Sequence, residues 1–285
     1  MADLPRLLAA ALAALSAASA AADVLVVTQP EVAQYGDVLA GFREVRPADP
    51  VDARNEEAVR AALARKPAVV VAIGSKAAAL VRAAAPAGTV IAAGVLGGEA
   101  ARGYAAVPLE ARAADAARAL GTLAPRVRKV AVLHPAGAGA AVADARAAAR
   151  AAGLEPTFWP LAELTDFQGL FRRAAEGADA VWLLADPRLA RPELVKFMVT
   201  FCLERRVPLV GFLDGMTRTG ALVSIAADFR AIGREAAHLA ADLEARPPEG
   251  PTPFRFAPGK VSVNERVREM LQLGGAVPAG AETVR

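Results

Sequence analysis

The alternation of apolar runs with helical segments is the feature that most constrains how this chain folds. Short runs rich in β-branched residues recur from residue 24 almost to the C-terminal end, and segments with helical periodicity lie between them. Apolar runs without polar alternation are typical of strands in a parallel sheet that helices cover on both faces. The sequence therefore predicts an α/β protein built on parallel sheets.

The expected strands and helices alternate along the chain almost to its end. The expected strands are 24–28, 68–73, 90–94, 129–133, 155–159, 180–184, 208–212 and 221–225. The clearest expected helices are 56–64, 76–85, 111–120, 141–152, 167–175, 192–205, 229–244 and 265–273.

These elements fall into two groups, one before Leu109 and one after Arg126. The stretch between them, GVLGGEAARGYAAVP, is expected to be weakly structured. Both groups open with a strand, a proline-bearing loop and an Ala-rich helix, in ADVLVVTQP and VRKVAVLHP. A chain of 285 residues has room for two lobes. We expect two Rossmann-like lobes whose strand carboxyl ends face a shared ligand cleft.

The N-terminal segment MADLPRLLAAALAALSAASAAA has the pattern of a secretory signal peptide. Arg6 precedes a short apolar run, and the small residues that follow offer cleavage after Ala20 or Ala22. The alternative is an Ala-rich amphipathic helix, because Asp3 offsets the charge of Arg6. No lipobox cysteine lies nearby, so residues 1–22 predict a freely diffusing periplasmic protein and not a lipoprotein.

Charge and hydropathy exclude a nucleic-acid-binding protein. The net charge is +3 and the pI is near 9.3, and the arginines are spread among acids instead of forming a basic block. The hydrophobic fraction of 55% is sufficient for a sizeable core.

Polar residues that follow the expected strands are the candidate ligand contacts, since ligands of open α/β sheets bind beyond the carboxyl ends of the strands. These candidates are Gln29, Tyr35, Ser75, His134, Asp186 and Asp214. Ser75 is expected at the N-cap of a helix, where its hydroxyl and the free backbone N–H groups suit a carboxylate or phosphate. The alternative for Ser75 is an ordinary helix cap.

The other candidates also have structural alternatives. Asp186 follows an apolar strand and either holds a ligand amine or hydroxyl or caps a helix. Asp214 has the same position after the next strand, with an Asp-Gly turn as its alternative. A core or backbone-bonded role is favoured for His134, and His238 is interpreted as structural.

The chain lacks the motifs of catalysis, metal binding and nucleotide binding. No GxSxG, HExxH, GxGxxG or P-loop pattern is present. The single cysteine, Cys202, recurs with apolar residues at helical spacing and is expected to be a buried core thiol. We therefore expect no enzyme activity, no metal and no cofactor.

A series of motifs in a fixed order resembles one known family. The series is Tyr35 with the following DVLAGF, then VVVAIGSKAA, VRKVAVLHP, DAVWLLADPRL, RRVPLVGF, TGALVSIAADFRAIGREAAHLA, VSVNERVREMLQLG and finally Pro278. From Asp23 to Pro278 the chain resembles the periplasmic substrate-binding proteins of ABC transporters, in the group related to binders of tryptophan and other aromatic amino acids.

The resemblance implies a type I periplasmic-binding-protein fold, with two lobes joined by three crossovers and closing around a ligand by hinge motion. It implies an N-terminal lobe of 23–108 plus about 227–254 and a C-terminal lobe of 109–226 plus about 255–285. Tyr35 and Ser75 would supply contacts from the first lobe, and Asp186 and Asp214 from the second.

The chain departs from the family pattern at two ligand-binding segments. Gly139 and Ala140 stand where typical transport members have an Asn-Ser pair. The segment GYAAVP lacks the Asn-x-Thr-Gly sequence of those members. Both departures remove polar groups from the expected cleft.

The leading hypothesis is a periplasmic solute-binding component of an ABC transport system, which binds an amino acid or organic acid, acts as a monomer and docks on a membrane permease. The alternative is a ligand- or partner-binding module for a membrane sensor. A third hypothesis is an isomerase or lyase on the same scaffold, using Asp186 or His134.

Overall fold

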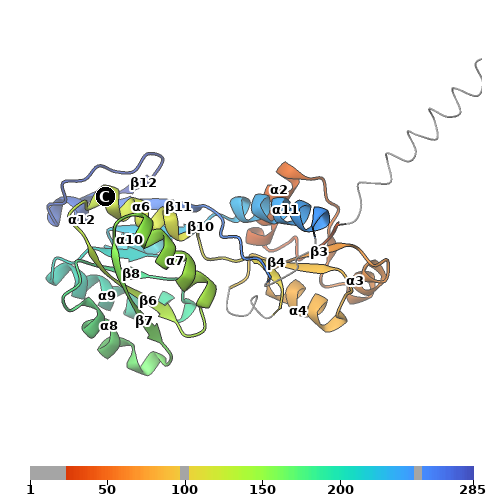
Figure 1. Ribbon diagram of the computed structural model, residues 1–285, viewed down its shortest axis with the longest axis horizontal. Helices are drawn as coiled ribbons and strands as arrows, with labels where there is room; N and C mark the ends of the chain where they lie inside the picture. Colours follow the sequence, from red (N-terminus) through yellow and green to blue (C-terminus); the bar gives the residue numbers. More distant parts are fainter. Residues whose placement is uncertain (1–23, 97–102, 247–251) are drawn as a thin grey trace, which may run out of the picture.

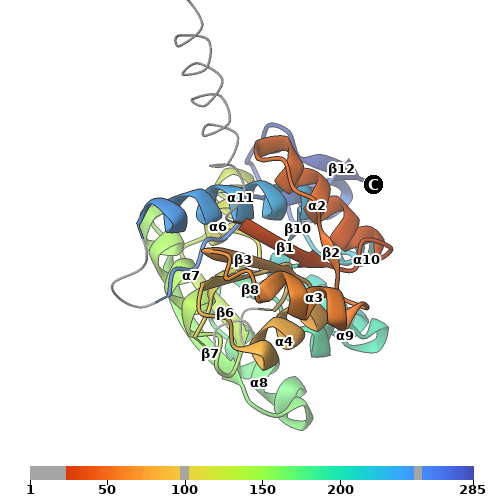
Figure 2. The ribbon, with the colours of Figure 1, turned by 90° about the vertical axis from the view of Figure 1, so that its right-hand side faces the viewer.

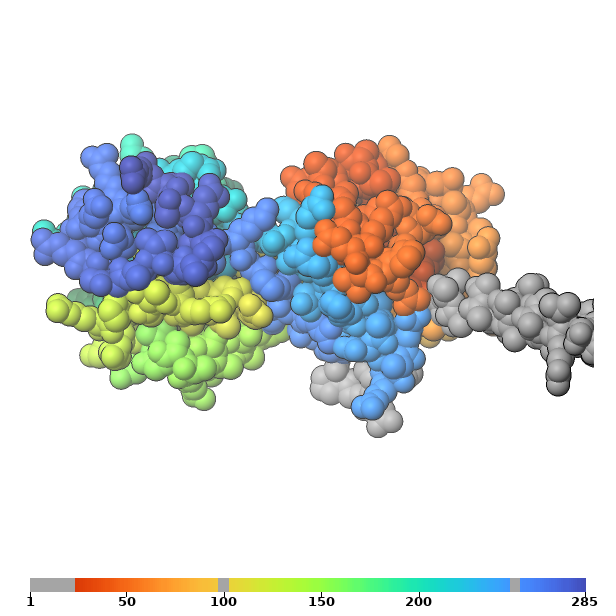
Figure 3. All heavy atoms as spheres, turned by 90° about the horizontal axis from the view of Figure 1, so that it is seen from above, coloured from red at the N-terminus to blue at the C-terminus, as the bar shows by residue number. Residues whose placement is uncertain are grey.

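The computed structural model describes residues 24–96, 103–246 and 252–285, which form two α/β lobes side by side (Figure 1). The predicted signal peptide, residues 1–22, lies outside the described residues, and so does part of the stretch GVLGGEAARGYAAVP. The space-filling view shows two masses joined by a narrower waist (Figure 3).

The first lobe contains a parallel sheet with strand order β2-β1-β3-β4-β5. Helices α2 and α11 cover one face of this sheet, and α3 and α4 cover the other (Figure 2). Its elements are β1 (Val24–Thr28), α2 (Ala33–Val45), β2 (Val51–Asp52), α3 (Glu56–Leu63), β3 (Val69–Ile73), α4 (Ser75–Ala84), β4 (Thr89–Ala93), β5 (Ala105–Val107) and α11 (Phe229–Ala245).

The second lobe contains a sheet with strand order β12-β11-β10-β9-β8-β6-β7, parallel except for the antiparallel pair of β10 and β11. Its strands are β6 (Lys129–Pro135), β7 (Glu155–Leu161), β8 (Ala180–Leu183), β9 (Leu209–Gly211), β10 (Val223–Ala227), β11 (Gly259–Asn264) and β12 (Glu282–Val284). Its helices are α6 (Ala113–Leu123), α7 (Gly139–Ala151), α8 (Phe167–Ala175), α9 (Pro192–Glu204), α10 (Asp214–Thr219), α12 (Glu265–Met270) and the short 3-10 turns η2 (Leu164–Asp166) and η3 (Pro187–Ala190).

The predicted α/β class with parallel sheets is confirmed, and the continuous apolar pattern has the expected cause. All five residues of β3 are buried, since helices cover both faces of the sheet around it. Alternate residues of β3 pack against α2 with α11 or against α3 with α4. A strand in this environment has no solvent side, so no polar residue is needed in it.

Several elements differ from the sequence-based expectation. Ala105–Val107 forms the edge strand β5, although the surrounding stretch was expected to be weakly structured. Three small apolar residues are enough there because β4 provides the pairing and the core buries all three. Strands β2, β11 and β12 and helix α10 were also missed, because they are short or contain polar residues.

Helix α11 returns the chain to the first lobe. It follows β10 of the second sheet, packs against α2 and covers β3, β4 and β5. Two glycines allow the close approach of the helices: a Cβ on Gly233 would overlap the backbone oxygen of Val38, and a Cβ on Gly41 would overlap that of Arg230. The contact therefore has no space for a side chain at either glycine.

Ion pairs hold the ends of this helix contact. Arg46 at the end of α2 forms a bidentate pair with Glu244 at the end of α11, and Glu44 accepts from Arg230 at 3.0 Å and from Arg234 at 2.8 Å. The hydrogen bonds from Arg234 and Arg230 lower the pKa of Glu44. The α2–α11 contact thus combines close backbone packing with charge pairing.

Gly233→Ala is expected to destabilise the protein by about 3 kcal/mol, because overpacking against a rigid backbone carbonyl cannot be relieved by a rotamer change. The measurement is the free energy of unfolding in denaturant. Gly121→Ala is the matched control, since Gly121 lies in α6 with open space around its Cβ position. The control should gain up to about 1 kcal/mol from helix propensity. Equal stability of the two variants would contradict the close packing.

The prediction that Cys202 is a buried core thiol is confirmed. Cys202 is 1% exposed in α9 and packs in a core with Phe171, Met198 and Phe201. Burial raises the pKa of the Cys202 thiol to about 12.

The native protein is expected not to react with a thiol reagent at pH 8. With a pKa of about 12, only about one Cys202 thiol in ten thousand is ionised there. Absorbance after addition of Ellman's reagent measures the reaction, and the same protein in denaturant provides the positive control. Rapid labelling of the folded protein would show that Cys202 is accessible.

Candidate functional site

The carboxyl ends of the parallel strands lie toward the junction of the two lobes. The chain leaves β5 at Val107 and enters α6 of the second lobe at Ala113, and it leaves β10 at Ala227 and enters α11 of the first lobe at Phe229. Parallel strands share one carboxyl edge, so the edge of each sheet that faces the other lobe is the edge where α/β proteins bind ligands.

The structure brings Tyr35 and Ser75 together at this edge of the first lobe. Tyr35 lies in the first turns of α2, and its ring rests on Gly74, where a Cβ would overlap the ring. Gly74 has a φ of 89° and immediately precedes the exposed Ser75. The Tyr35 ring therefore lies against the residue that immediately precedes Ser75 at the start of α4.

The expected role of Ser75 as the N-cap is wrong. Gly74 is the N-cap of α4, Ser75 is the first helical residue, and no side chain caps the helix. The positive φ of Gly74 sets this boundary one residue earlier than a serine cap would. Gln29 lies half-buried just after β1, where its backbone carbonyl accepts a hydrogen bond from Val32. Both Gln29 and Ser75 stay predictions as ligand contacts.

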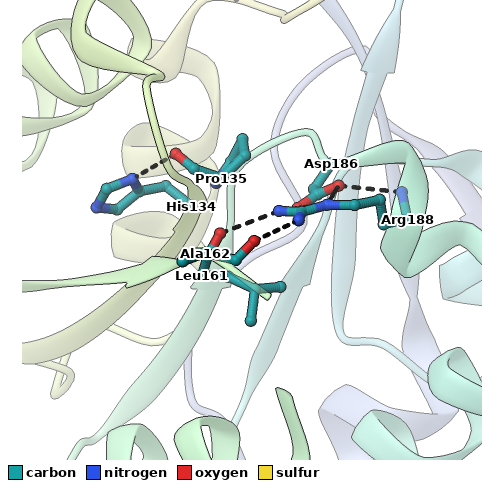
Figure 4. A network of polar contacts seen from close by, with 6 residues as sticks. All are labelled: His134, Pro135, Leu161, Ala162, Asp186 and Arg188. Carbon is teal, nitrogen blue, oxygen red and sulfur yellow. Dashed lines mark hydrogen bonds and ion pairs between the residues drawn. The ribbon is translucent and has the colours of Figure 1, made fainter. Parts of the chain in front are cut away.

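Asp186 is engaged within the second lobe. Its side chain is 2% exposed, and its carboxylate accepts from the backbone N–H of Arg188 at 3.0 Å and from Nη2 of Arg188 at 2.8 Å. Figure 4 shows the guanidinium of Arg188 reaching from this carboxylate to the carbonyl oxygens of Leu161 and Ala162, at 3.0 and 2.7 Å. Asp186 also caps the turn η3.

The interaction of Asp186 with Arg188 corresponds to the capping alternative and leaves little of the carboxylate for a ligand. Asp186 raises the pKa of Arg188 through their hydrogen bonds. The charged pair ties the loop after β8 to the end of β7. A ligand would have to displace the Arg188 guanidinium to reach Asp186.

His134 and Asp214 lie in different parts of the second lobe and differ in exposure. His134 is half-buried at the end of β6, where its Nδ1 lies 3.0 Å from the carbonyl oxygen of Pro135 and its ring packs edge-on to Phe158. Asp214 is exposed in the first turn of α10, and this helix replaces the expected Asp-Gly turn. Asp214 lines a groove with Lys260 and the segment 277–280, on the side of β11.

Two small cavities lie at the carboxyl edge of the second sheet, next to the interlobe segments. Their volumes are about 40 and 20 Å³, and both are lined by Glu110, Ala141 and Phe256. The larger cavity is also lined by apolar residues that include Trp182, Phe212 and Ile225, and by the charged residues Arg112 and Asp144. None of the six candidate residues lines either cavity.

Sequence reasoning missed the aromatic residues of these cavities. Trp182 was interpreted only as part of a buried strand, and Phe256 lies in a segment for which no element was expected. Phe256 could have been identified from its position in a segment between the two expected lobes, because aromatic residues make up only 5% of this chain.

The loop between β6 and α7 presents backbone but no polar side chain. The loop is Ala136 to Ala138, and helix α7 begins at Gly139 without a side-chain cap, so that the loop and the first residues of the helix together read AGAGAA from Ala136 to Ala141. This part of the second-lobe edge therefore offers a ligand only small apolar side chains and the N–H groups of the first turn of α7.

In the described part of the chain, no group of three or more His, Cys, Asp or Glu side chains is placed to hold a metal ion. None of the helices within the described ranges has both the length and the apolar character that a membrane crossing requires.

Comparison with known proteins identifies one family. The family model described as ABC transporter substrate binding protein matches residues 52–273. No curated protein sequence matches the chain.

Solved structures with the same fold are similar over nearly the whole chain. An ABC domain in complex with L-Trp from Streptococcus pneumonia is 17% identical, with a TM-score of 0.54, and the match covers 92% of this chain and 100% of that one. A ligand-free, open substrate-binding protein with adhesive properties from Clostridium difficile is 13% identical, with a TM-score of 0.61, over 92% and 98%. A conserved domain protein from Vibrio cholerae is 18% identical, with a TM-score of 0.55, over 92% and 99%.

Asp186→Ala is expected to lower the free energy of unfolding by about 2 kcal/mol, since it removes hydrogen bonds to a charged partner and the cap of η3. Denaturant unfolding measures this change. Asp214→Ala is the matched control, an exposed acid after the neighbouring strand, and should change stability by no more than about 0.5 kcal/mol. If Asp186→Ala were as stable as the control, the ion pair with Arg188 would not contribute to the free energy of unfolding.

Proposed function

The chain belongs to the family of ABC transporter substrate-binding proteins, and from this premise we propose that it binds a small solute between its lobes and delivers it to the permease of an ABC transporter. The solute-binding role follows from the family and the fold. The proposed solute is an amino acid or organic acid with an apolar body. The proposed partners are this solute and the membrane permease, and the proposed form in solution is a monomer.

One observation carries the proposal: the carboxyl ends of both parallel sheets face the same interlobe junction. Tyr35 and Ser75 offer a ring and a hydroxyl on the first-lobe side. Phe212 and Phe256 line the cavity on the second-lobe side, together with the charged residues Glu110, Arg112 and Asp144. Apolar walls with few polar groups are typical of small-molecule sites, and they suit a ligand with a flat or branched hydrocarbon part.

The geometry supports binding without chemistry. The two groups that a lyase or isomerase would use, Asp186 and His134, are hydrogen-bonded to Arg188 and to the Pro135 carbonyl. The alternative of a module for a membrane sensor is favoured by one observation, the lack of polar side chains in the loop from Ala136 to Ala141. A sensor module that binds a protein partner does not need those polar contacts.

A thermal-shift screen of residues 23–285 tests the function. Aromatic and branched amino acids, small carboxylates and purines are the compounds, and a true ligand at about 100 Kd should add roughly 2.7 kcal/mol to the stability of the folded state. The readout is the melting temperature, which should rise by several degrees.

Ser75→Ala should reduce the shift caused by a ligand while leaving the melting temperature of the free protein nearly unchanged, since Ser75 is exposed. Tyr35→Ala should also reduce the shift, and it should lower the melting temperature of the free protein, because the ring packs on Gly74 and on the first-lobe core. Asp214→Ala, whose carboxylate lies in the groove beside Lys260, is the control. A screen in which no compound shifts the melting temperature would favour the sensor alternative.

Proteins of this family are typically extracytoplasmic, and we propose that the present chain reaches the periplasm through the signal peptide 1–22. Mass spectrometry of the protein from a periplasmic extract is expected to give a chain beginning at Ala21 or Asp23, with no lipid attached. An intact Met1 on a protein confined to the cytoplasmic fraction would contradict export.

A further inference from the structure

The edge of the second sheet that lies opposite the junction carries an excess of positive charge. The parallel strands of this sheet end at the junction, so each connecting helix runs back and ends at the opposite edge. The helix ends and loops that precede β6, β7, β8 and β9 therefore share this edge, and Figure 1 shows α8 and α9 on the side of the second lobe away from the first. Their exposed cationic side chains, which we call the basic row, are Arg126, Arg128, Lys129, Arg150, Arg172, Arg173, Arg205 and Arg206.

The basic row forms one continuous surface. Strands β9, β8, β6 and β7 are neighbours in the sheet in this order. Adjacent strands lie about 4.8 Å apart, so the four strands span about 15 Å. Asp179, just before β8, accepts the backbone N–H groups of Arg128 and Lys129, just before β6, at 2.9 and 2.8 Å. These hydrogen bonds fix the two loops to each other at the centre of the row.

Two arginines of the basic row stack on the same aromatic ring. The guanidinium carbon of Arg172 lies 5.3 Å from the ring centroid of Phe201, and that of Arg205 lies 3.8 Å from it. Phe201 is 6% exposed, so its ring lies beneath both guanidinium groups. The ends of α8 and α9 therefore present two positive charges beside each other.

The acidic side chains of this edge do not neutralise the basic row. Four exposed acids lie in the same segments as the eight cations, namely Glu155, Glu176, Asp179 and Glu204. Within the described ranges, none of the eight cations forms an ion pair, although ion pairs are frequent elsewhere in the molecule. The dipole of a helix favours a cation at its C-terminal end, but it does not account for adjacent cations without an acidic partner.

The chemistry of the basic row fits an extended anionic surface better than a protein partner or a single anion. Stable protein interfaces centre on buried apolar or aromatic side chains. Among the described residues, the exposed large apolar side chains are Val45, Leu213 and Met270, and none of them lies in the segments of the row. The groove of about 310 Å³ beside Lys129 does not suit an anion, because Glu155 and Glu176 line it. Clustered cations are attracted to anionic lipid headgroups, and each cation adds to the attraction.

We propose that the basic row binds the surface of a bilayer that contains anionic lipids. This inference goes beyond the proposed solute binding and does not depend on it. The candidate ligand contacts of the second lobe lie toward the junction, at the other edge of the sheet, so they stay accessible in the bound protein. Binding at the row keeps the protein at the membrane in which the proposed permease is located.

Co-sedimentation of the full chain with lipid vesicles tests the proposal. At low salt, the wild-type protein is expected to bind vesicles that contain phosphatidylglycerol more tightly than vesicles of phosphatidylcholine alone. The difference should disappear in about 1 M salt, where the Debye length is only about 3 Å. Residues 1–22 are the same in every variant, so differences between variants report on the substituted side chains.

Arg205→Gln combined with Arg206→Gln should weaken binding to the phosphatidylglycerol vesicles by about thirtyfold, because each cation near an anionic surface contributes a factor of about five. Arg65→Gln combined with Lys66→Gln is the matched control in the first lobe and should bind as the wild type does. Both pairs are exposed and follow a helix, and Arg206 and Lys66 share a φ of 56°. Thermal melting of each double variant confirms that it is folded.

Equal binding of the wild type to both kinds of vesicle would overturn the proposal and favour an acidic protein as the partner of the basic row. Equal losses in the two double variants would also overturn it. Free glycerol phosphate, at the phosphate concentration of the lipid, should leave the bound fraction unchanged, because one anion engages only part of the row. Displacement of the protein by glycerol phosphate would instead indicate a site for a small anion. The thermal-shift screen tests solute binding separately from these measurements.

Discussion

The buried carboxylate of Asp115 is the interaction on which the junction between the lobes depends. Its carboxylate accepts hydrogen bonds from the side chains of Arg112 and Arg118 and from the backbone N–H of Gly259. These bonds join the chain segment that enters the second lobe to the segment that returns to it. A buried carboxylate is costly unless its oxygens are satisfied, and here each oxygen has a donor. The two segments are consequently held together where they enter the second lobe, and Phe256, just before the second segment, has a defined position.

The cleft differs from one in which charged side chains surround a polar solute. From its sequence position after an apolar strand, Asp186 was a good candidate for a ligand contact. Its carboxylate instead binds the guanidinium of Arg188, which also donates to two backbone carbonyls. The larger cavity at the second-lobe edge is lined mainly by rings and small apolar side chains, together with Glu110, Arg112 and Asp144. Selectivity in such a site comes from shape and from hydrogen bonds to backbone N–H groups.

The fold could be predicted from the sequence because its central strands are buried on both faces. Val69–Ile73 has no alternative to a covered parallel strand, and the helices around it have clear apolar faces. Strands β5 and β12 could not be predicted, since three residues paired at a sheet edge leave no periodic pattern.

The site was harder to predict than the fold. The list of polar residues after the strands included Tyr35 and Ser75, which do lie together, but it could not show that Arg188 would neutralise Asp186 two residues away. Phe256 carries no local signal either, because its position depends on hydrogen bonds from both lobes to its neighbours. Sequence position locates the edge of a sheet, whereas the partners of a side chain depend on the tertiary structure.

The contact between α2 and α11 also has a consequence for how the chain acquires its structure. Arg46 and Glu244 are 198 residues apart, so the first lobe cannot bury its α2 face until almost the entire chain is available. Contacts of such long sequence separation form late and slow folding, because a large loop must close first. The N-terminal half of a nascent chain therefore stays incomplete until helix α11 has been synthesised.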